Sequence, residues 1–208
     1  SDDGTLEILK SHADNPDFNY LSEPDDGQSD AINKGFEMAS GEYVGWLNSD
    51  DVFFDKGVLE RVVGYFQSYK ADVVYGDMAL LDVNSKVLKV HCVPDFDVQL
   101  LLRYCFIEQP ALFFRGKVIN ENKLDVNLEY VMDYEFWLRL AHDYRFKHVE
   151  DILAGDRNHT DRKILHDREE MLSEARELQE SYGVSHNWRY RFDRGADKLF
   201  SGFPRRLK

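Results

Sequence analysis

The stretch Tyr43-Val44-Gly45-Trp46-Leu47-Asn48-Ser49-Asp50-Asp51 joins a short apolar run to four adjacent polar residues, two of which are carboxylates. The apolar part has the length and bounds of a buried strand, so its carboxyl end delivers the polar cluster. Oxygen ligands on a rigid element, with positions left for water and phosphate, are what a hard divalent cation requires. Asp50 and Asp51 are therefore predicted to form a metal and diphosphate site. The alternative is that this cluster caps the next helix.

The segments around this strand alternate between helical and strand periodicity. One helix is predicted to begin at a Ser29 or Asp30 cap and to end at Gly41, and a second covers residues 56–69, before a strand at residues 73–75. This alternation favours a parallel sheet covered by helices, in which ligands bind beyond the carboxyl ends of the strands.

The same patterns predict the remaining elements. Turn-forming residues at the centre of residues 78–90 indicate a hairpin, so antiparallel strands are expected to join the sheet. The other expected elements are helices at residues 6–12, at 98–102, from Asp133 and over 164–178 with a stop at Gly183, and strands at residues 18–21 and after Gln109.

The composition argues against membrane-spanning, nucleic-acid-binding and disulfide-rich proteins. A chain of 208 residues can bury one core without crosslinks, and no apolar run approaches the roughly 20 residues of a membrane span. The net charge of −13 argues against a nucleic-acid binder, although a divalent cation can still bring a diphosphate to an acidic site. Cys92 and Cys105 form no disulfide framework or zinc motif, which indicates a reducing, cytoplasmic compartment.

Several blocks of the sequence resemble the family 2 glycosyltransferases. The central block of that family is similar to residues 27–35 (GQSDAINKG), 39–44 (ASGEYV) and 46–51 (WLNSDD). Further resemblances follow in the family's order: its early Asp-Gly-Thr turn at residues 3–5, its acceptor-side segment at 109–111 and its catalytic-base helix at 132–139. The resemblance runs from Ser1 to about Leu165. It implies an α/β, A-type glycosyltransferase fold, a Rossmann-like mixed sheet flanked by helices, in an inverting enzyme that uses a nucleotide sugar.

Carried over position by position, the resemblance implies roles for three carboxylates. Asp51 would bind a divalent metal, Mn or Mg, and Asp50 would lie against the ribose or diphosphate. Asp133 would be the general base that takes the proton of the acceptor hydroxyl. Two alternatives remain open: Asp133 caps the first turn of its helix and complements its dipole, or Glu135 is the base.

Further candidates follow from the same comparison. Residues 156–160 (DRNHT) resemble a segment in which family members often place an Arg near the diphosphate or a His near the metal. Arg157 and His159 are predicted in these roles, with a structural histidine as the alternative for His159. Gln28 and Asp30 are expected to position the nucleotide or to cap their helix. The predicted substrate-binding set is completed by Gln109 and Asp3.

The two ends of the sequence differ from its middle. The family usually opens with an apolar strand and helix that bind the nucleotide base, roughly one strand-loop-helix unit, whereas this sequence opens on a turn. We therefore predict a catalytic domain at residues 1–183 that lacks this first unit; a trimmed terminus is the alternative. The basic and aromatic tail at residues 184–208 is predicted to contact a membrane surface or a partner, or to form a helix packed on the domain.

The function expected from these features is transfer of a sugar from a nucleoside-diphosphate sugar to a glycan or lipid-linked acceptor, as in bacterial surface-polysaccharide synthesis. Nucleic acid is excluded as a partner by charge, and peripheral contact with the inner face of the membrane is expected only through the tail. Two alternatives remain: a sugar-phosphate nucleotidyltransferase with a similar sheet, and a non-catalytic nucleotide-binding module with the same fold.

Overall fold

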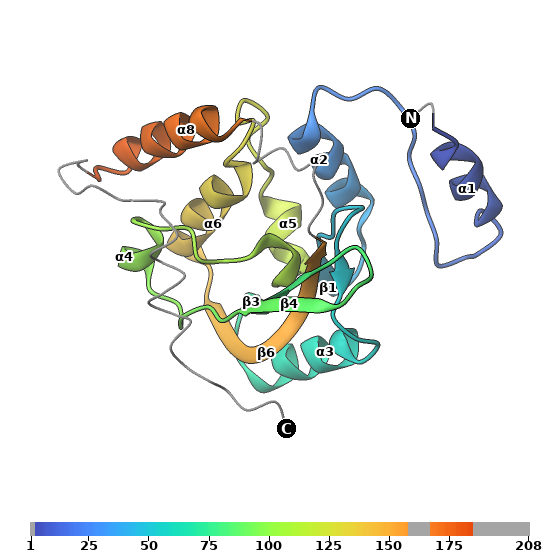
Figure 1. Cartoon of the computed structure of the whole chain (residues 1–208), viewed down its shortest axis with the longest axis horizontal. Coiled ribbons are helices and arrows are strands. Elements are labelled where there is room, and N and C mark those ends of the chain that lie inside the picture. The colour runs from blue at the N-terminus through green and yellow to red at the C-terminus, as the bar shows by residue number, and fades with distance from the viewer. Residues whose placement is uncertain (1–2, 158–166, 185–208) are drawn as a thin grey trace.

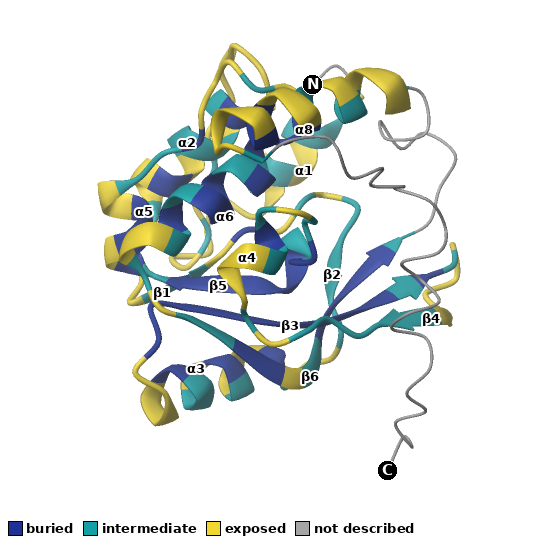
Figure 2. Ribbon diagram, turned by 90° about the vertical axis from the view of Figure 1, so that its left-hand side faces the viewer, coloured by how far each residue is buried: buried dark blue, intermediate teal, exposed yellow. Residues whose placement is uncertain are grey.

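The computed structural model describes residues 3–157 and 167–184, and these form one mixed sheet with helices on both faces (Figures 1 and 2). The tail at residues 185–208 and the segment 158–166, which contains His159, lie outside the described residues. The strands are β1 (Tyr43–Gly45), β2 (Val52–Phe53), β3 (Val73–Leu81), β4 (Val87–His91), β5 (Leu112–Arg115) and β6 (Phe146–Arg157).

The sheet order is β1-β5-β3-β6-β2, and β4 pairs with β3 beyond the end of β5. Among the strands of the described residues, only β3 and β6 pair in parallel. The expectation of a parallel sheet was therefore wrong, while the mixed sheet of the predicted fold class is confirmed. The reason is that β5 inserts antiparallel between β1 and β3, whose directions agree but which are not neighbours. The predicted hairpin is confirmed as β3 and β4.

The helices divide unequally between the two faces of the sheet. Figure 2 shows α3 alone on one face and α2, α5, α6 and α8 gathered on the other. The helices of the described residues are α1 (Thr5–Ser11), α2 (Gln28–Met38), α3 (Val58–Ser68), α4 (Val98–Leu101), the 3-10 turn η1 (Gln109–Ala111), α5 (Gly116–Glu121), α6 (Met132–Asp143) and α8 (Arg168–Ser181).

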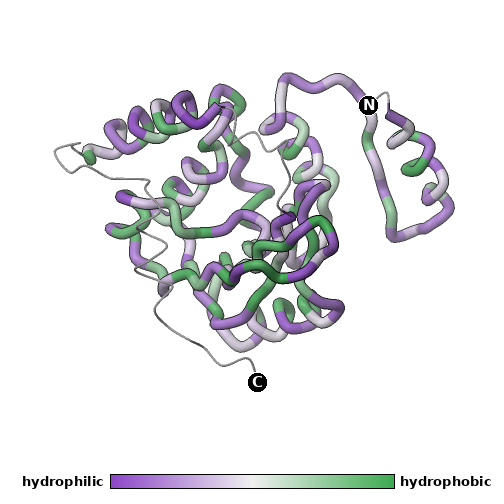
Figure 3. Tube along the Cα trace, in the orientation of Figure 1, coloured by the Kyte–Doolittle hydropathy of each residue, from purple (hydrophilic) through white to green (hydrophobic). Residues whose placement is uncertain are grey.

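The core follows this division. The larger cluster of buried side chains lies under α2, α5 and α6, with Phe114, Phe136 and Trp137 at its centre; the smaller one lies under α3 around Val62 and Phe66. Hydrophobic residues concentrate on the central strands, whereas α8 is largely hydrophilic (Figure 3). Trp137 is 0% exposed and is a core residue, so α6 presents its apolar side to the sheet.

Two local predictions are corrected and one is confirmed. Residues 18–21 form no strand, and α2 begins after Gly27 (φ 108°) without a side-chain cap from Ser29 or Asp30. Ser29 instead turns inward and donates to the Met132 sulfur. At the end of α8, Gly183 (φ 78°) donates to Glu180 O and Val184 donates to Gln179 O, which is the predicted glycine stop.

The helix α1 lies apart from the sheet (Figure 1), and none of its residues is buried. Across the described ranges 3–157 and 167–184, no helix is long and apolar enough to cross a membrane.

Candidate functional site

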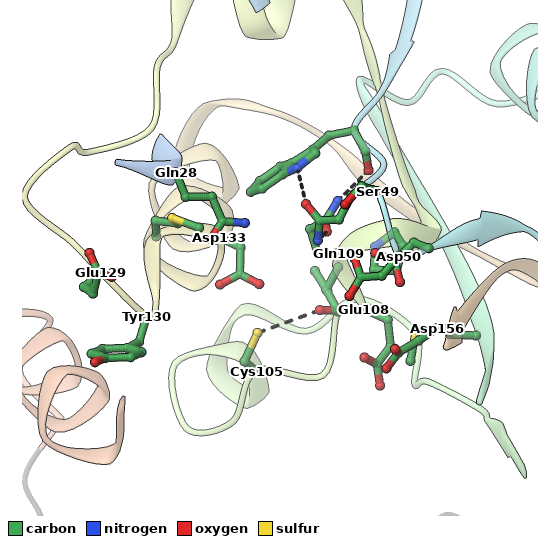
Figure 4. Close-up of a pocket in the computed structure, with 17 residues that line it drawn as sticks. Gln28, Ser49, Asp50, Cys105, Glu108, Gln109, Glu129, Tyr130, Asp133 and Asp156 are labelled. Atoms are coloured by element: carbon green, nitrogen blue, oxygen red, sulfur yellow. Dashed lines mark hydrogen bonds between the residues drawn. The ribbon is translucent and has the colours of Figure 1, made fainter. Parts of the chain in front are cut away.

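A cavity of about 550 Å³ opens where the ends of β1, η1, β6 and α6 meet. Its walls carry six carboxylates and two aromatic residues, together with amide, thiol and thioether groups (Figure 4). The carboxylates are those of Asp50, Asp51, Glu108, Glu129, Asp133 and Asp156. Of the predicted site residues, the cavity brings together Asp50, Asp51, Gln28, Gln109 and Asp133.

The polar cluster after β1 forms a turn at the cavity wall, in which Asp51 N–H donates to Asn48 O at 3.2 Å. The chain then enters β2, and α3 begins only at Val58 with Gly57 as its N-cap. The cluster therefore caps no helix, and that alternative is wrong for Asp50 and Asp51. Their carboxylates lie at the cavity instead.

Three side chains lock this turn to η1 in a closed ring of hydrogen bonds. The Trp46 indole N–H donates to Asn48 Oδ1 at 3.1 Å, and Asn48 Nδ2 donates to Gln109 Oε1 at 2.9 Å. Gln109 Nε2 then donates to the Trp46 carbonyl, which closes the ring. Both ends of the Gln109 amide are thus bonded within the protein. Gln109 shapes the Asn48–Asp51 turn, a role the sequence did not indicate.

Replacement of Gln109 by Ala is expected to lower the free energy of unfolding by about 1–3 kcal/mol, because Asn48 Nδ2 and the Trp46 carbonyl lose a partner in a partly buried site. Urea unfolding monitored by tryptophan fluorescence measures the change. Gln67→Ala on the exposed face of α3 is the matched control, since Gln67 is exposed. Equal stability of the two variants would contradict the ring.

Asp156 is a cavity residue that sequence reasoning did not single out, although it begins the segment that suggested Arg157. The β2–β6 register pairs Val52 with Gly155, so its continuation places Asp51 opposite Asp156. A Cβ at Gly155 would lie 2.5 Å from the Leu81 side chain of β3 and 3.3 Å from the Val52 side chain of β2, so the glycine permits close packing of β6 against both neighbours. Asp156 is 8% exposed and adds a third carboxylate to the side of the cavity that holds Asp50 and Asp51.

Asp133 projects into the cavity from the first turn of α6 (Figure 4). The N-cap of α6 is Val131 and not Asp133. Asp133 Oδ1 nevertheless accepts the Tyr134 N–H at 2.7 Å, so Asp133 also satisfies a backbone donor in the first turn of the helix, which is the alternative role. Burial raises the pKa of Asp133 to about 6, against the opposing effect of the Tyr134 N–H, and the Glu108 charge adds to the rise. A carboxyl with this pKa is mostly ionised at neutral pH yet basic enough to accept a proton.

Glu135, the alternative base, lies outside the cavity and pairs with another residue. Glu135 forms a two-point ion pair with Arg139 at 2.8 and 2.9 Å and does not line the cavity. Glu108 does line it, and its Oε1 lies 3.1 Å from His91 Nδ1. Cys105 is a wall residue whose thiol pKa is raised by burial, so the thiol stays protonated.

Three described candidates lie away from the cavity lining. Asp3 accepts from the N–H and hydroxyl of Thr5 at the start of α1, and Asp30 pairs with Lys34 at 3.0 Å and accepts the Asp26 N–H. Arg157 is the last residue of β6 and follows Asp156 without lining the cavity. The predicted substrate contacts of these three residues, and the metal role of His159, stay predictions.

Comparisons with known proteins identify the family. The model of glycosyl transferase family 2 matches residues 1–106, just over half of the 208-residue chain. The chain belongs to glycosyl transferase family 2. The matched part includes Asp50 and Asp51 and ends before Asp133, so the family match itself does not reach the candidate base.

Two curated relatives of this glycosyl transferase family 2 chain share less than 30% of their aligned residues with it. An uncharacterized glycosyltransferase of Methanocaldococcus jannaschii is 28% identical over 133 residues, which are 61% of this chain and 46% of that protein. A PGL/p-HBAD biosynthesis glycosyltransferase of Mycobacterium bovis is 27% identical over 67% of this chain and 54% of its own length. The chain thus spans about half the length of these curated relatives.

Among solved structures, S. aureus TarS residues 1–349 in complex with UDP-GlcNAc matches with a TM-score of 0.63 at 17% identity. The match covers 86% of this chain and 54% of that one. This likeness confirms the A-type glycosyltransferase fold that the sequence predicted for this family 2 member.

A divalent metal is the cofactor that this fold class implies. The cavity carboxylates are the side chains that could bind it. Asp50, Asp51 and Asp156 offer the carboxylate oxygens that Mg²⁺ and Mn²⁺ prefer. Within the described residues no three His, Cys, Asp or Glu side chains converge as a complete ligand set. Sites of this kind usually use one or two carboxylates and take their other ligands from water and substrate phosphate, so these residues fit such a metal.

Proposed function

We propose that this chain is the catalytic part of an inverting glycosyltransferase that moves a sugar from a nucleoside-diphosphate sugar to an acceptor hydroxyl. The observation that carries the proposal is that Asp133, with a pKa raised to about 6, faces the same cavity as Asp50 and Asp51. A proton acceptor and an acidic metal-binding edge in one cavity are the two groups that such a displacement needs.

The two sides of the cavity have separate tasks in this proposal. Asp51, with Asp50 and Asp156 beside it, would hold the divalent metal on the donor side of the cavity. When bound, the metal would neutralise the negative charge that develops on the departing nucleoside diphosphate. The hydrogen-bonded ring of Trp46, Asn48 and Gln109 holds the Asn48–Asp51 turn in place. The carboxylates of this turn therefore need no reorganisation when the donor binds.

Asp133 takes the acceptor proton. Attack of the acceptor oxygen on the anomeric carbon requires loss of the hydroxyl proton, and a carboxylate within hydrogen-bond reach can accept it. Figure 4 shows Asp133 below Gln28, with Glu129 and Tyr130 on one side of it and Asp50 and Asp156 on the other, across the cavity. An acceptor that enters at Glu129 and Tyr130 would approach the donor from the side opposite its diphosphate, which is the geometry of a single inverting displacement.

The donor and acceptor classes are proposals drawn from distant relatives. TarS was solved with UDP-GlcNAc, and a chondroitin synthase of Pasteurella multocida is 26% identical over 73% of this chain. We therefore propose a UDP-sugar donor and a glycan or lipid-linked acceptor, as in bacterial surface-polysaccharide synthesis.

The test is donor turnover by the intact protein with Mn²⁺ and UDP-GlcNAc, UDP-glucose or UDP-galactose. We expect release of UDP, faster with an acceptor glycan than with water alone. Because these donors are α-linked, NMR of the first product should show the β anomer. An α product would contradict inversion, and neither UDP release nor UDP binding with any donor would contradict the transferase assignment.

The same assay should show a pH signature of Asp133. The base is active only when ionised, so kcat/KM is expected to rise tenfold per pH unit below about 6 and to level off above it. Glu108 contributes to the raised pKa, so Glu108→Gln should move this limb to lower pH. A limb that stays near pH 4 in the wild-type protein would exclude Asp133 as the base.

A further inference from the structure

A carboxylate of α8 binds the chain segment that leads into the Asp133 helix. Glu174 Oε1 accepts the Glu129 N–H at 2.8 Å, and its Oε2 accepts the N–H groups of Tyr130 at 2.6 Å and Val131 at 2.9 Å. These contacts join positions more than 40 residues apart in the sequence. One side chain thus satisfies three consecutive backbone donors.

The segment that Glu174 holds forms part of the cavity wall. Residues 122–131 between α5 and α6 contain no helix or strand, and the N-cap of α6, Val131, makes no side-chain cap hydrogen bond. Glu129 and Tyr130 line the cavity, and Asp133 follows two residues after Val131. Without Glu174 the three N–H groups would lose their protein acceptor just where the wall and the base are set.

The helix α8 is itself fixed to two other parts of the fold, the chain around α4 and the start of α6. Gln179, which is 4% exposed, donates to Arg103 O at 3.2 Å and lies 3.3 Å from the Tyr134 hydroxyl. That hydroxyl donates to Leu101 O at 2.7 Å. Ala175 and Leu178 are buried in the larger core cluster. Glu174 therefore projects from a helix that is held in place both by buried apolar side chains and by hydrogen bonds of Gln179.

We propose that Glu174 is a positioning residue for the reaction: it holds residues 129–131, and through them the start of α6, so that Asp133 faces the acceptor. This inference rests on the proposed function for its consequence and on the three hydrogen bonds for its geometry. Figure 4 shows Glu129 and Tyr130 on the side of Asp133 away from Asp50 and Asp156, so the segment held by Glu174 is the acceptor side of the cavity. The donor side is held separately by the Trp46, Asn48 and Gln109 ring.

The test compares Glu174→Gln with Glu177→Gln, which makes the same change of charge one turn away on α8. Glu177 is exposed, and its side-chain contact is with Ser173 of the same helix at 3.5 Å. In Glu174→Gln we expect amide hydrogen exchange within residues 129–131 to accelerate about tenfold or more, because the single oxygen of an amide cannot accept three such bonds. Glu177→Gln should exchange like the wild type. Turnover is not needed for this measurement.

Kinetics then separate positioning from a general loss of structure. We expect Glu174→Gln to lower kcat about 10- to 100-fold with the donor KM unchanged, because only the acceptor side loosens. Water that reaches Asp133 should also move the acid limb of kcat/KM to lower pH, and Glu177→Gln should move neither quantity.

Each result decides the inference. Wild-type exchange at residues 129–131 in Glu174→Gln, an unchanged kcat, or a loss matched by global unfolding would overturn it. If the wild-type protein shows no turnover, the transferase proposal fails, while the exchange measurement still decides whether Glu174 holds the segment.

Discussion

Asp133→Asn is expected to lower kcat/KM for sugar transfer by about 10²–10⁴-fold, because the amide cannot accept the proton of the acceptor hydroxyl. The variant keeps the size of the side chain and an oxygen for the Tyr134 N–H, so the start of α6 should not move. Binding of UDP and Mn²⁺ should stay at the wild-type level, since Asp50 lies across the cavity from Asp133 (Figure 4) and Asp51 is the next residue in the chain. Initial-rate kinetics and calorimetric titration measure the two effects.

The same variant should be at least as stable as the wild type at pH 7. The Asp133 pKa is about 6 in the folded protein and 3.8 for the ordinary carboxyl, so between these values the folded state binds more protons and stability falls as pH rises. Above pH 6 the ionised, desolvated carboxylate costs the fold on the order of 1–3 kcal/mol, which the neutral amide avoids. Thermal unfolding of Asp133→Asn at pH 7 should show no loss in Tm.

Asp143→Asn is the matched control, because Asp143 is the last residue of the same helix and is exposed. It is expected to transfer sugar at the wild-type rate. Near-normal turnover in Asp133→Asn would show that Asp133 serves only the helix end through the Tyr134 N–H.

Asp51→Asn is expected to lower kcat/KM by about 30- to 1000-fold, which corresponds to several kcal/mol of lost charge stabilisation on the leaving diphosphate. Removal of one charge from the site should also weaken Mn²⁺ binding in the presence of UDP, which calorimetry measures directly. Asp50→Asn is expected to lose less, because its proposed contact is with the ribose or diphosphate and not primarily with the metal.

The control for this change is Asp14→Asn, at an exposed position between α1 and α2 that does not line the cavity. It should bind Mn²⁺ and UDP like the wild type. Wild-type titration of Mn²⁺ and UDP by Asp51→Asn would remove Asp51 from the metal site and leave Asp50 and Asp156 as the remaining carboxylates of that side.

The sequence predicted the parts of the fold that local patterns encode. Helical spacing of apolar residues gave α3, α6 and α8, and turn-forming residues gave the β3–β4 hairpin. Short elements failed: residues 18–21 form no strand, because four residues carry too little periodicity to separate a strand from an extended loop. The resemblance to the family 2 glycosyltransferases extended the prediction to the mixed sheet and to Asp50, Asp51 and Asp133 as site residues.

The role of the polar cluster after β1 was determined partly by the sequence and partly by the tertiary structure. The sequence by itself determined that a strand precedes Asn48–Asp51 and that a helix starts near Asp133, because both follow from residues adjacent in the chain. Whether these carboxylates cap helices or share a cavity depended on where β2 and α3 begin.

Only the tertiary structure placed Asp156 opposite Asp51, closed the ring through Gln109 and brought Glu174 to residues 129–131. These contacts join segments about 40 to 100 residues apart, and no periodicity within either segment specifies its partner. The physical reason is that pairing register and helix packing are chosen by burial of the whole core, which no local stretch contains.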